Sequence, residues 1–406
     1  MPRVLIVGGS LGGLMAANLL QRAGIDVLVL ERSPRSLEGR GAGIVTHAAL
    51  LAALRAAGAV VDDTLGVWVD ERVVLDAAGD AAQRWPHRQL LTSWGRLYAL
   101  LRAALPPACM RLGAAVAAVQ PDDDGVTVTL AGGETLRADL LVAADGIRST
   151  VRAQLAPQVQ PQYAGYVAWR GVCDEAALSR LTRQTLFPHF AFGLPEGEQM
   201  LGYPVAGADD GTLPGQRRWN FVWYRPAGAD ELKALLTDAD GVHYAEGIPP
   251  QQVSWRHIAA MRQAARERLA PQFAEVVEKT AAPFLQPIFD FISPRLAQGR
   301  VALLGDAAMV ARPHVGMGVA KAGDDAVALA LAGAALGTTP AALLQYDLLR
   351  QPAGAAVVER ARQLGAYLQA QRGGHAARRS DEAVMHETAI DPGLFAPVTS
   401  TEAQPG

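Results

Sequence analysis

Residues 4–13 read VLIVGGSLGG, an apolar run that continues directly into a glycine-rich turn. Four consecutive apolar residues of this kind are typical of a parallel strand that is covered on both faces. A helix-like segment from Leu14 to Ala23 follows, then Gly24 and a second apolar run, Val27–Leu30, that ends at Glu31. Strand, glycine turn, helix and acidic strand end together predict a dinucleotide-binding fold at the start of the chain.

Each part of this turn has a task in holding a pyrophosphate. Gly8 permits the tight turn, Gly13 lets the helix and the strand pack closely, and the helix N-terminus offers free N–H groups to the phosphates. Glu31 suits the hydroxyls of an adenosine ribose. Ser10 replaces the usual middle glycine, and its hydroxyl can donate a hydrogen bond to a phosphate. The turn alone does not distinguish NAD from FAD.

Two later motifs favour FAD. Residues 138–149, ADLLVAADGIRS, form an apolar strand that ends in Asp-Gly, and residues 301–308, VALLGDAA, form a second apolar strand that ends in Gly-Asp. Residues 313–320 then lead through two glycines into an alanine-rich helix. An aspartate at a strand end can accept hydrogen bonds from sugar-alcohol hydroxyls, and the helix start brings backbone N–H groups against a flat ring. This arrangement suits a reduced flavin, which carries negative charge.

The motifs GGSLGG, ADGIRS and GDAAMVARPHVGMG resemble those of the single-component (class A) flavoprotein aromatic hydroxylases. The resemblance extends along nearly the whole chain, including the turn GAGI at residues 41–44 and the helix start at Arg96. The runs YAGYVAWRGV at 163–172 and RPH at 312–314 most resemble family members that hydroxylate pyridine rings. The chain departs from the family at Met317 and Ala320, where glutamine and asparagine are common.

The resemblance implies an α/β fold like that of p-hydroxybenzoate hydroxylase. A Rossmann-type FAD-binding domain with a parallel sheet is interleaved with a smaller substrate domain built on an antiparallel sheet. The alternating, aromatic-rich strand patterns between Tyr163 and Tyr224 also predict the antiparallel sheet. The expected boundaries are 1–66, 91–160 and 287–350 for the FAD-binding domain, 67–90 and 161–286 for the substrate domain, 351–385 for a C-terminal helix and 386–406 for a loose tail.

The resemblance also implies the cofactors and the reaction. FAD is bound without a covalent link, and NADH or NADPH is a transient co-substrate together with dioxygen. A hydroperoxyflavin would then hydroxylate a small electron-rich ring, such as 2,6-dihydroxypyridine. The expected FAD contacts come from the three motifs and the segments between them: Gly8, Ser10, Leu11, Gly12, Gly13, Glu31, Arg32, Gly43, Arg96, Val116, Asp145, Asp306, Gly316, Gly318, Val319 and Ala320. For Asp145 the alternative is a structural cap.

The candidate catalytic residues lie beside the last motif. A neutral histidine can accept a proton near neutral pH, which makes His314 the first candidate for the base. Its neighbours Arg312, which could bind an anionic hydroxypyridine, and Pro313 complete the catalytic set. The alternatives are a histidine that merely caps a loop and an arginine in a surface ion pair. His47, Phe192, Tyr203 and Trp223 are the candidate substrate contacts, although aromatic residues on strands are more often ordinary core.

Composition excludes several classes of function. A net charge of −3 and a pI near 6.3 provide no basic field for nucleic acid or anionic lipid. Cys109 and Cys173 lie in no metal-ligand spacing, so we expect no metal site. The chain shows no signal peptide and no apolar run that would span a bilayer, so we expect a cytoplasmic protein. The resemblance implies a homodimer.

Three alternatives stay open. A related hydroxylase or epoxidase could act on a phenol, a salicylate-like acid or a urate-like ring. The glycine turn by itself would also fit an NAD-dependent dehydrogenase, although the Gly305-Asp306 motif counts against that class. The third alternative is a non-catalytic protein that uses FAD as a scaffold for a partner. A flavin halogenase is disfavoured because the chain contains no Trp-x-Trp-x-x-Pro segment.

Overall fold

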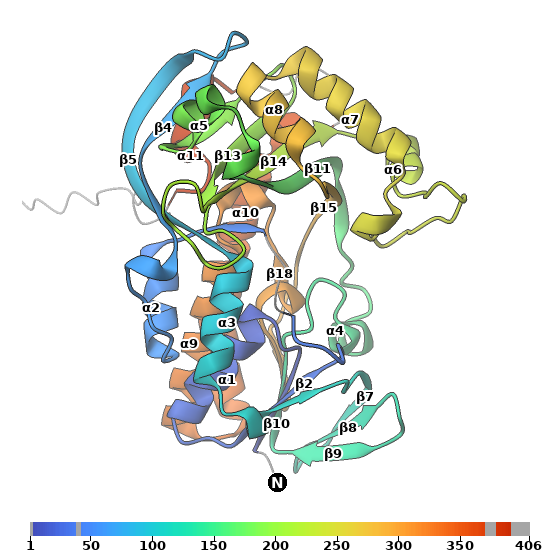
Figure 1. Ribbon diagram of the computed structural model, residues 1–406. Helices are drawn as coiled ribbons and strands as arrows, with labels where there is room; N and C mark the ends of the chain where they lie inside the picture. Colours follow the sequence, from blue (N-terminus) through green and yellow to red (C-terminus); the bar gives the residue numbers. More distant parts are fainter. Residues whose placement is uncertain (1–2, 38–41, 370–378, 391–406) are drawn as a thin grey trace, which may run out of the picture.

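The computed structural model describes residues 3–37, 42–369 and 379–390. The chain forms two lobes, each built on its own large sheet (Figure 1). The sheet of the lower lobe has six strands, and the apolar runs Val4–Val7 and Leu140–Ala143 are its two central strands. Its order is β16 (Ala297–Gln298), β17 (Val301–Leu303), β10 (Leu140–Ala143), β1 (Val4–Val7), β2 (Val27–Glu31) and β6 (Met110–Leu112).

All neighbours in this sheet run parallel except β16 and β17. Every residue of β1 and β10 is buried, as expected for strands covered on both faces. Because β2, β1, β10 and β17 are neighbours, their carboxyl ends meet at one edge, where open α/β sheets bind ligands. The predicted dinucleotide-binding fold is confirmed.

Helices pack closely against the lower sheet. The alanine-rich helix α9 (Gly318–Leu336) contacts α1 (Leu11–Arg22), α2 (Ala48–Ala56) and α10 (Pro340–Leu364). The helix α3 (Trp94–Ala104) contacts α1. A small sheet of β7 (Val116–Pro121), β8 (Val126–Leu130) and β9 (Thr135–Ala138) completes the lobe, with α4 (Thr150–Leu155) against β7.

The upper lobe contains a nine-stranded sheet that is antiparallel apart from one pair, β12 with β4. Strands from segments expected in the FAD-binding domain also enter this sheet at both edges, so the two lobes share chain segments. Its order is β18 (Met309–Val310), β15 (Phe284–Ile292), β11 (Gln162–Asp174), β14 (Arg218–Pro226), β13 (Gln199–Val205), β12 (His189–Gly193), β4 (Val67–Leu75), β5 (Ala81–Ser93) and β3 (Gly43–Val45).

The two faces of this sheet pack against different partners. The outer face lies under α5 (Arg180–Leu186), α7 (Trp255–Arg268) and α8 (Pro271–Lys279), and α6 (Ala229–Leu235) precedes α7. The opposite face, called the inner face below, carries a separate cluster that includes Phe190, Phe192, Leu201, Tyr203 and Tyr224. Alternate residues of a strand point to opposite faces of the sheet. Only every second residue of each strand therefore belongs to the inner face and can reach the lower lobe.

The C-terminal part of the chain differs from expectation. The helix expected over 351–385 is the second half of α10, which begins at Pro340, and a separate helix α11 spans Asp381–Glu387. The expected loose tail is packed where it is described, because residues 388–390 are buried. The remainder, 391–406, lies outside the described residues, as does Gly41 of the GAGI turn. Within the described ranges, no helix is long and apolar enough to cross a membrane.

Candidate active site

The glycine turn after β1 has the close contacts that require glycine. Gly8 adopts a φ of +103°, and a Cβ atom there would overlap the carbonyl of Ala144. A Cβ atom on Gly13 would overlap the carbonyl oxygen of Gly8. The helix α1 begins at Leu11, and the side chain of Ser10 at its N-cap makes no capping hydrogen bond. The N–H groups of the first helical turn therefore stay available to an anion, and the turn fits a pyrophosphate.

The acidic residue at the end of β2 is bound to this turn. Glu31 is buried, and its carboxylate oxygens accept hydrogen bonds from the backbone nitrogens of Gly9 and Ser33, each at 2.8 Å. The next residue, Arg32, is exposed. The predicted contact Val116 begins β7, close to Ala114, whose N–H donates to the Glu31 carbonyl at 2.9 Å. Glu31, Arg32 and Val116 thus lie at one end of the candidate cofactor site.

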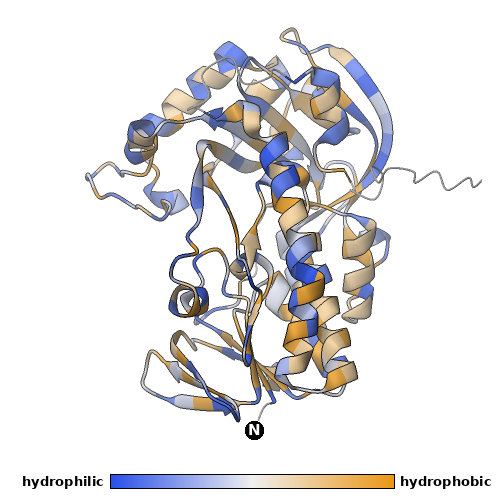
Figure 2. Ribbon diagram, turned by 180° about the vertical axis from the view of Figure 1, so that it is seen from behind, coloured by the Kyte–Doolittle hydropathy of each residue, from blue (hydrophilic) through white to orange (hydrophobic). Residues whose placement is uncertain are grey.

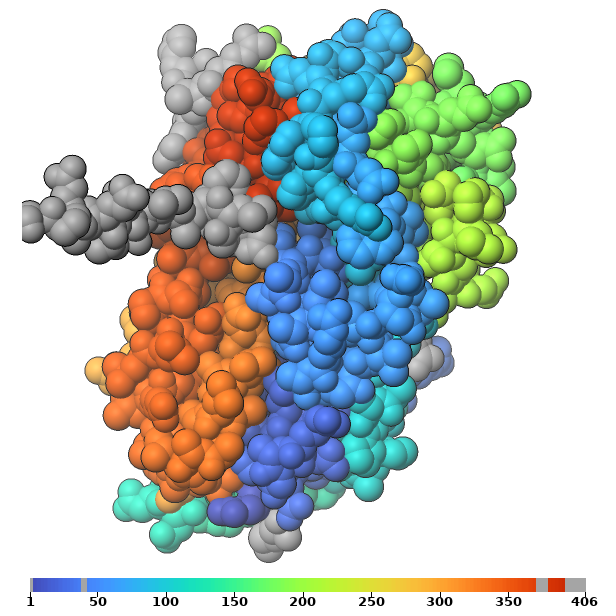
Figure 3. Space-filling view, turned by 90° about the vertical axis from the view of Figure 1, so that its left-hand side faces the viewer, coloured from blue at the N-terminus to red at the C-terminus, as the bar shows by residue number. Residues whose placement is uncertain are grey.

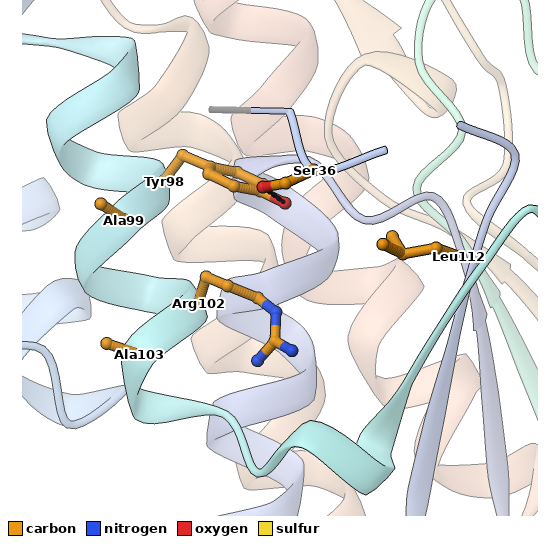
Figure 4. Close-up of a pocket in the computed structure, with 6 residues that line it drawn as sticks. All are labelled: Ser36, Tyr98, Ala99, Arg102, Ala103 and Leu112. Carbon is orange, nitrogen blue, oxygen red and sulfur yellow. Dashed lines mark hydrogen bonds between the residues drawn. The ribbon is translucent and has the colours of Figure 1, made fainter. Parts of the chain in front are cut away.

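A hollow of about 400 Å³ adjoins this end of the site (Figure 4). Ser36, from the loop after β2, and Leu112, at the end of β6, line one side of it. Tyr98 and Arg102 of α3 line the other side, and the Ser36 and Tyr98 hydroxyls are 3.5 Å apart. Sequence reasoning did not identify this hollow.

Two aspartates flank the N-terminus of α1 at the ends of β10 and β17. Asp145 lies beside Gly8, and burial raises its pKa. Its Oδ2 accepts a hydrogen bond from the Val151 nitrogen at 3.3 Å, whereas Oδ1 is buried without a partner among the described residues. Asp306 follows β17, and its side chain is exposed. The expected contacts Gly12 and Leu11 lie between the two acids, where Gly12 faces Leu304.

A buried ionic network behind Asp306 holds this edge of the sheet in place. Lys321 of α9 donates to the Gly305 carbonyl at 2.9 Å and lies 3.4 Å from Asp325. Asp325 accepts from the Gly305 nitrogen at 3.2 Å and from Arg350 of α10 at 2.8 Å. Sequence reasoning missed this network; the only local signal was a lysine four residues before an aspartate in an alanine-rich helix.

The loop at residues 311–318 connects β18 to α9 and lies against both lobes. Gly316 has a φ of +67°, and its carbonyl is 3.0 Å from Nε2 of His47. α9 begins at Gly318, which is exposed, and a Cβ atom there would meet no other atom within 4 Å. Val319 is half-buried and Ala320 is buried. The helix start therefore offers backbone N–H groups at an open position, which fits the edge of a flat ring.

The candidate base His314 lies in this loop but is almost fully buried. Its Nε2 is 2.9 Å from the hydroxyl of Tyr166, and its ring centre is 4.3 Å from that of Tyr224. Burial, and secondarily the charge of Arg312, lowers the pKa of His314 to about 3. Its Nδ1 has no partner in the described part of the chain. The imidazole is thus neutral at neutral pH and faces the inner face of the upper sheet.

Arg312 is paired within the protein. Its Nε donates to Asp290 at 2.6 Å, and Arg362 donates to the other oxygen of that carboxylate at 2.6 Å. Both Arg312 and Asp290 are buried, and Pro313 follows as the first residue of a 3₁₀ turn that ends at Val315. Arg312 is therefore not a surface ion pair, because it is buried against Asp290, and its Nη1 has no partner among the described residues.

Two of the residues predicted to contact the substrate lie together on the inner face, and a third lies on the opposite face of the sheet. Phe192 and Tyr203 belong to the inner-face cluster. The expectation that Trp223 lines the same site is wrong, because Trp223 packs in the cluster under α7 and α8 and donates to Glu198 at 2.9 Å. Its neighbour Tyr224 occupies the inner face instead. The hydroxyls of Tyr203 and Tyr224 have no hydrogen-bond partner among the residues that the structure describes.

Asn220 of β14 is a further polar residue that sequence reasoning missed. It is 1% exposed, and its Oδ1 accepts a hydrogen bond from the Gly43 nitrogen at 2.8 Å. Because only the amide oxygen can accept, Nδ2 must be the free end, and it has no partner among the described residues. A Cβ atom on Gly43 would lie 2.5 Å from the Tyr203 ring, so Gly43 contacts the inner face. The expected contact Arg96 pairs instead with Asp210 at 2.9 Å.

Comparison with known proteins agrees with this geometry. A family described as FAD binding domain-like matches residues 163–290, and the lycopene cyclase protein family matches residues 3–176. The 2,6-dihydroxypyridine 3-monooxygenase of Paenarthrobacter nicotinovorans is 32% identical over 330 residues, which cover 81% of this chain and 82% of that protein. The aurachin C monooxygenase/isomerase of Stigmatella aurantiaca is also 32% identical, over 86% of this chain and 84% of that protein.

A solved structure extends the match to nearly the whole chain. The 2,6-dihydroxypyridine-3-hydroxylase from Arthrobacter nicotinovorans superposes with a TM-score of 0.86 at 28% identity. The match covers 95% of this chain and 96% of that chain, so both lobes share its arrangement.

Proposed function

Because the chain belongs to the family of FAD-dependent aromatic monooxygenases, we propose that it hydroxylates a hydroxypyridine, with 2,6-dihydroxypyridine as the first candidate. NADH or NADPH and dioxygen would be the co-substrates. The observation that carries the proposal is the inner face, where aromatic walls surround polar groups without partners opposite the loop at 311–318. A small ring with hydroxyl groups can satisfy those polar groups.

The cofactor is assigned to the carboxyl edge of the lower sheet. The glycine turn and the start of α1 would hold the pyrophosphate, with Glu31 at the ribose end. Asp306 would accept hydrogen bonds from sugar-alcohol hydroxyls, and the N–H groups at Gly318 would contact the flavin ring. When bound, FAD supplies hydride acceptance and the activation of dioxygen.

The protein's own side chains would bind and orient the substrate. Tyr203 and Tyr224 would offer their hydroxyls, and Asn220 would donate from Nδ2 to a ring oxygen or nitrogen. Arg170 of β11 has no acidic partner among the described residues. Burial raises the pKa of both tyrosines, whereas the positive charge of Arg170 lowers it, so this charge acts on the inner face. We therefore assign to Arg170, rather than to Arg312, the electrostatic stabilisation of an anionic hydroxypyridine.

His314 fits a hydrogen-bonding role better than that of a base. A group with a pKa near 3 holds a proton too weakly to remove one from a substrate near neutral pH. Its contact with the Tyr166 hydroxyl fixes the loop at 311–318 against the inner face. His314 would thus position the loop and present Nδ1 toward the ring.

A homodimer is part of the proposal. Leu344, Leu348 and Leu349 are exposed along the N-terminal half of α10, where Figure 2 shows apolar positions on the outer surface. Exposed apolar surface of this kind is typical of subunit contacts. Sedimentation of the purified protein measures the assembly state.

The proposal is tested by following NADH and NADPH oxidation by the FAD-loaded protein with and without 2,6-dihydroxypyridine, while hydrogen peroxide is assayed in parallel. We expect strong stimulation with little peroxide. Stimulation with much peroxide would indicate a neighbouring substrate, because the ring would be bound but misplaced. Absence of stimulation by this ring, but coupled turnover with a phenol, a salicylate or a urate-like ring, would overturn the pyridine assignment.

A further inference from the structure

Arg72, on β4, is a fully buried cation that has no acidic partner among the described residues. Its guanidinium donates to Gln89 Oε1 from Nε at 3.0 Å and from Nη2 at 2.5 Å. The remaining bonds go to main-chain carbonyls near the C-terminus: Met385 at 2.8 Å, Thr388 at 2.6 Å and Ala389 at 3.0 Å. The pKa of Arg72 is lowered by burial to about 9, so the side chain stays charged at neutral pH. A buried charge of this kind needs those acceptors, because leaving it unsatisfied is costly.

The segment that Arg72 holds, Thr388–Ile390, is called the C-terminal strap here. All three residues are buried, and Ala389 adopts a φ of +53°, which is unusual for a residue other than glycine. Gln89 Nε2 also donates to the Ala389 carbonyl, at 3.2 Å, and Gln199 Nε2 donates to the Thr388 hydroxyl at 3.3 Å. The upper lobe therefore fixes the strap through side chains from three strands, β4, β5 and β13.

The other side of the strap contacts the loop at 311–318. The Ala389 nitrogen donates to the His314 carbonyl at 2.8 Å. A Cβ atom on Gly316 would lie 2.7 Å from the Cβ of Ala389, so the two backbones are as close as glycine permits. The strap thus lies between the inner-face strands and the loop that leads into α9.

The helix before the strap is anchored to the rest of the protein. Glu387 pairs with Arg360 of α10 at 2.5 Å and with Arg379 at 2.6 Å. The His386 ring centre lies 4.3 Å from that of Trp85 of β5, with the two rings tilted relative to each other. Figure 3 shows this C-terminal part, in red, seated beside the blue strands β4 and β5. The strap is therefore a docked part of the fold rather than a free end.

We propose that the C-terminal strap is a wall of the substrate site and that Arg72 is the positioning residue that holds it there. The strap would keep the loop at 311–318 pressed toward the flavin and exclude water from the reacting ring. This inference rests on the proposed function. It assigns no chemistry to Arg72, which acts through the strap.

The test compares two shortened chains. A chain that ends at Ile390 keeps the strap, whereas a chain that ends at Glu387 removes it and leaves α11. Two readouts are taken on the FAD-loaded proteins: the fraction of oxidised NADH that appears as peroxide, and the quenching of flavin fluorescence by iodide. The chain ending at Ile390 should match the full chain in both. The chain ending at Glu387 should bind FAD but show several-fold more peroxide and several-fold stronger quenching, because water and iodide reach the flavin.

Substitutions at Arg72 test the same wall without shortening the chain. Arg72→Met removes the charge and all the hydrogen-bond donors of the side chain, so it should raise the peroxide fraction and the iodide quenching as the chain ending at Glu387 does. Arg72→Lys keeps the charge and should give less peroxide than Arg72→Met. Arg217→Met is the matched control, because Arg217 pairs with Glu175 at 2.8 Å elsewhere in the upper lobe. It should lower thermal stability without changing peroxide or quenching.

Two outcomes would overturn the inference: unchanged quenching and coupling in the chain ending at Glu387, or equal uncoupling in Arg72→Met and Arg217→Met at equal loss of stability. If the chain ending at Glu387 does not fold, the arginine variants decide. Failure of the proposed function is distinguishable, because iodide quenching is measured without any aromatic substrate.

Discussion

Adjacent aromatic side chains of β14 serve different parts of the molecule. Trp223 is buried in the outer cluster and donates its indole N–H to Glu198, whereas Tyr224 lies on the inner face beside His314. The run from Trp219 to Tyr224 is apolar or aromatic at almost every position. Because both faces of the strand are covered, its pattern has no alternation that would reveal which aromatic residues face the site.

The two residues give a matched pair of substitutions. Tyr224→Phe should raise the KM for the aromatic substrate by roughly five- to tenfold, because one hydrogen bond worth about 1 kcal/mol is lost. The same substitution should leave the free energy of unfolding nearly unchanged. Trp223→Phe should lower the free energy of unfolding by about 1–3 kcal/mol, because a buried carboxylate loses a donor, and leave KM unchanged. Steady-state kinetics and urea unfolding measure both. The reverse pattern would show that the inner face is not the substrate side.

His314 should also be visible in the pH dependence of stability. Its pKa is about 3 in the folded protein and near 6.5 when unfolded, so between these values the unfolded chain binds a proton that the folded protein does not. The free energy of unfolding should therefore fall as the pH drops below about 6.5, with a slope of up to about 1.4 kcal/mol per pH unit from this residue.

His314→Gln removes this proton and should flatten the dependence between about pH 5 and 6.5. Urea unfolding at a series of pH values provides the measurement, and His243→Gln is the control because His243 is exposed. Equal slopes in the natural protein and in His314→Gln would mean that the imidazole is not held neutral by burial.

At the scale of elements, the shape of the strand–glycine–helix unit depends on close contacts between main-chain atoms, which only glycine permits. Gly8 and Gly13 let β1 and α1 approach at the point where a pyrophosphate would bind. Gly13→Ala forces a methyl group against the Gly8 carbonyl and should weaken FAD binding by at least about a hundredfold, since the helix start is displaced from the phosphates.

Gly132→Ala is the control for this substitution, because its Cβ atom would meet no other atom within 4 Å. It should leave FAD affinity unchanged. Titration followed by flavin fluorescence measures both variants. If Gly13→Ala binds FAD as tightly as the natural protein, the cofactor does not lie on this turn.

The sequence predicts elements whose parts are contiguous and misses contacts that join distant segments. The glycine turn, the aspartates that follow two apolar strands and the aromatic-rich strands of the upper sheet are local patterns, and the structure confirms the fold that they indicate. Arg72, by contrast, binds carbonyls more than 300 residues away, as the separations of 313 and 317 residues show. No local pattern reveals such a contact, nor the contact of Arg350 with Asp325, which joins α10 to α9.

The same reasoning applies to charged residues near the site. For Arg312 the sequence left open an anion-binding role and a surface ion pair, and the folded protein places it in a buried ion pair with Asp290. Arg170 belongs to a run that carried the family resemblance, and only the folded structure reveals that it has no acidic partner within the described part of the chain. Electrostatic roles therefore depended on packing, whereas cofactor binding followed from motifs.

At the scale of the whole molecule, the two lobes are joined by shared segments. The upper sheet includes β3, β15 and β18, which come from segments next to the cofactor motifs, and α10 contacts strands of both large sheets. The loop at 311–318 and the C-terminal strap lie at this junction. The proposed substrate site is thus formed by both lobes.

The central claim is that this chain inserts an oxygen atom from dioxygen into an aromatic ring. The most direct measurement is turnover of 2,6-dihydroxypyridine by the FAD-loaded protein under isotopically labelled ¹⁸O₂, followed by mass spectrometry of the product. The account predicts one labelled oxygen on the ring and the other in water. A hydroxylated product without label would mean that the oxygen came from water, and NADH oxidation that yields only labelled peroxide would mean that the protein is an oxidase; either result would contradict the account.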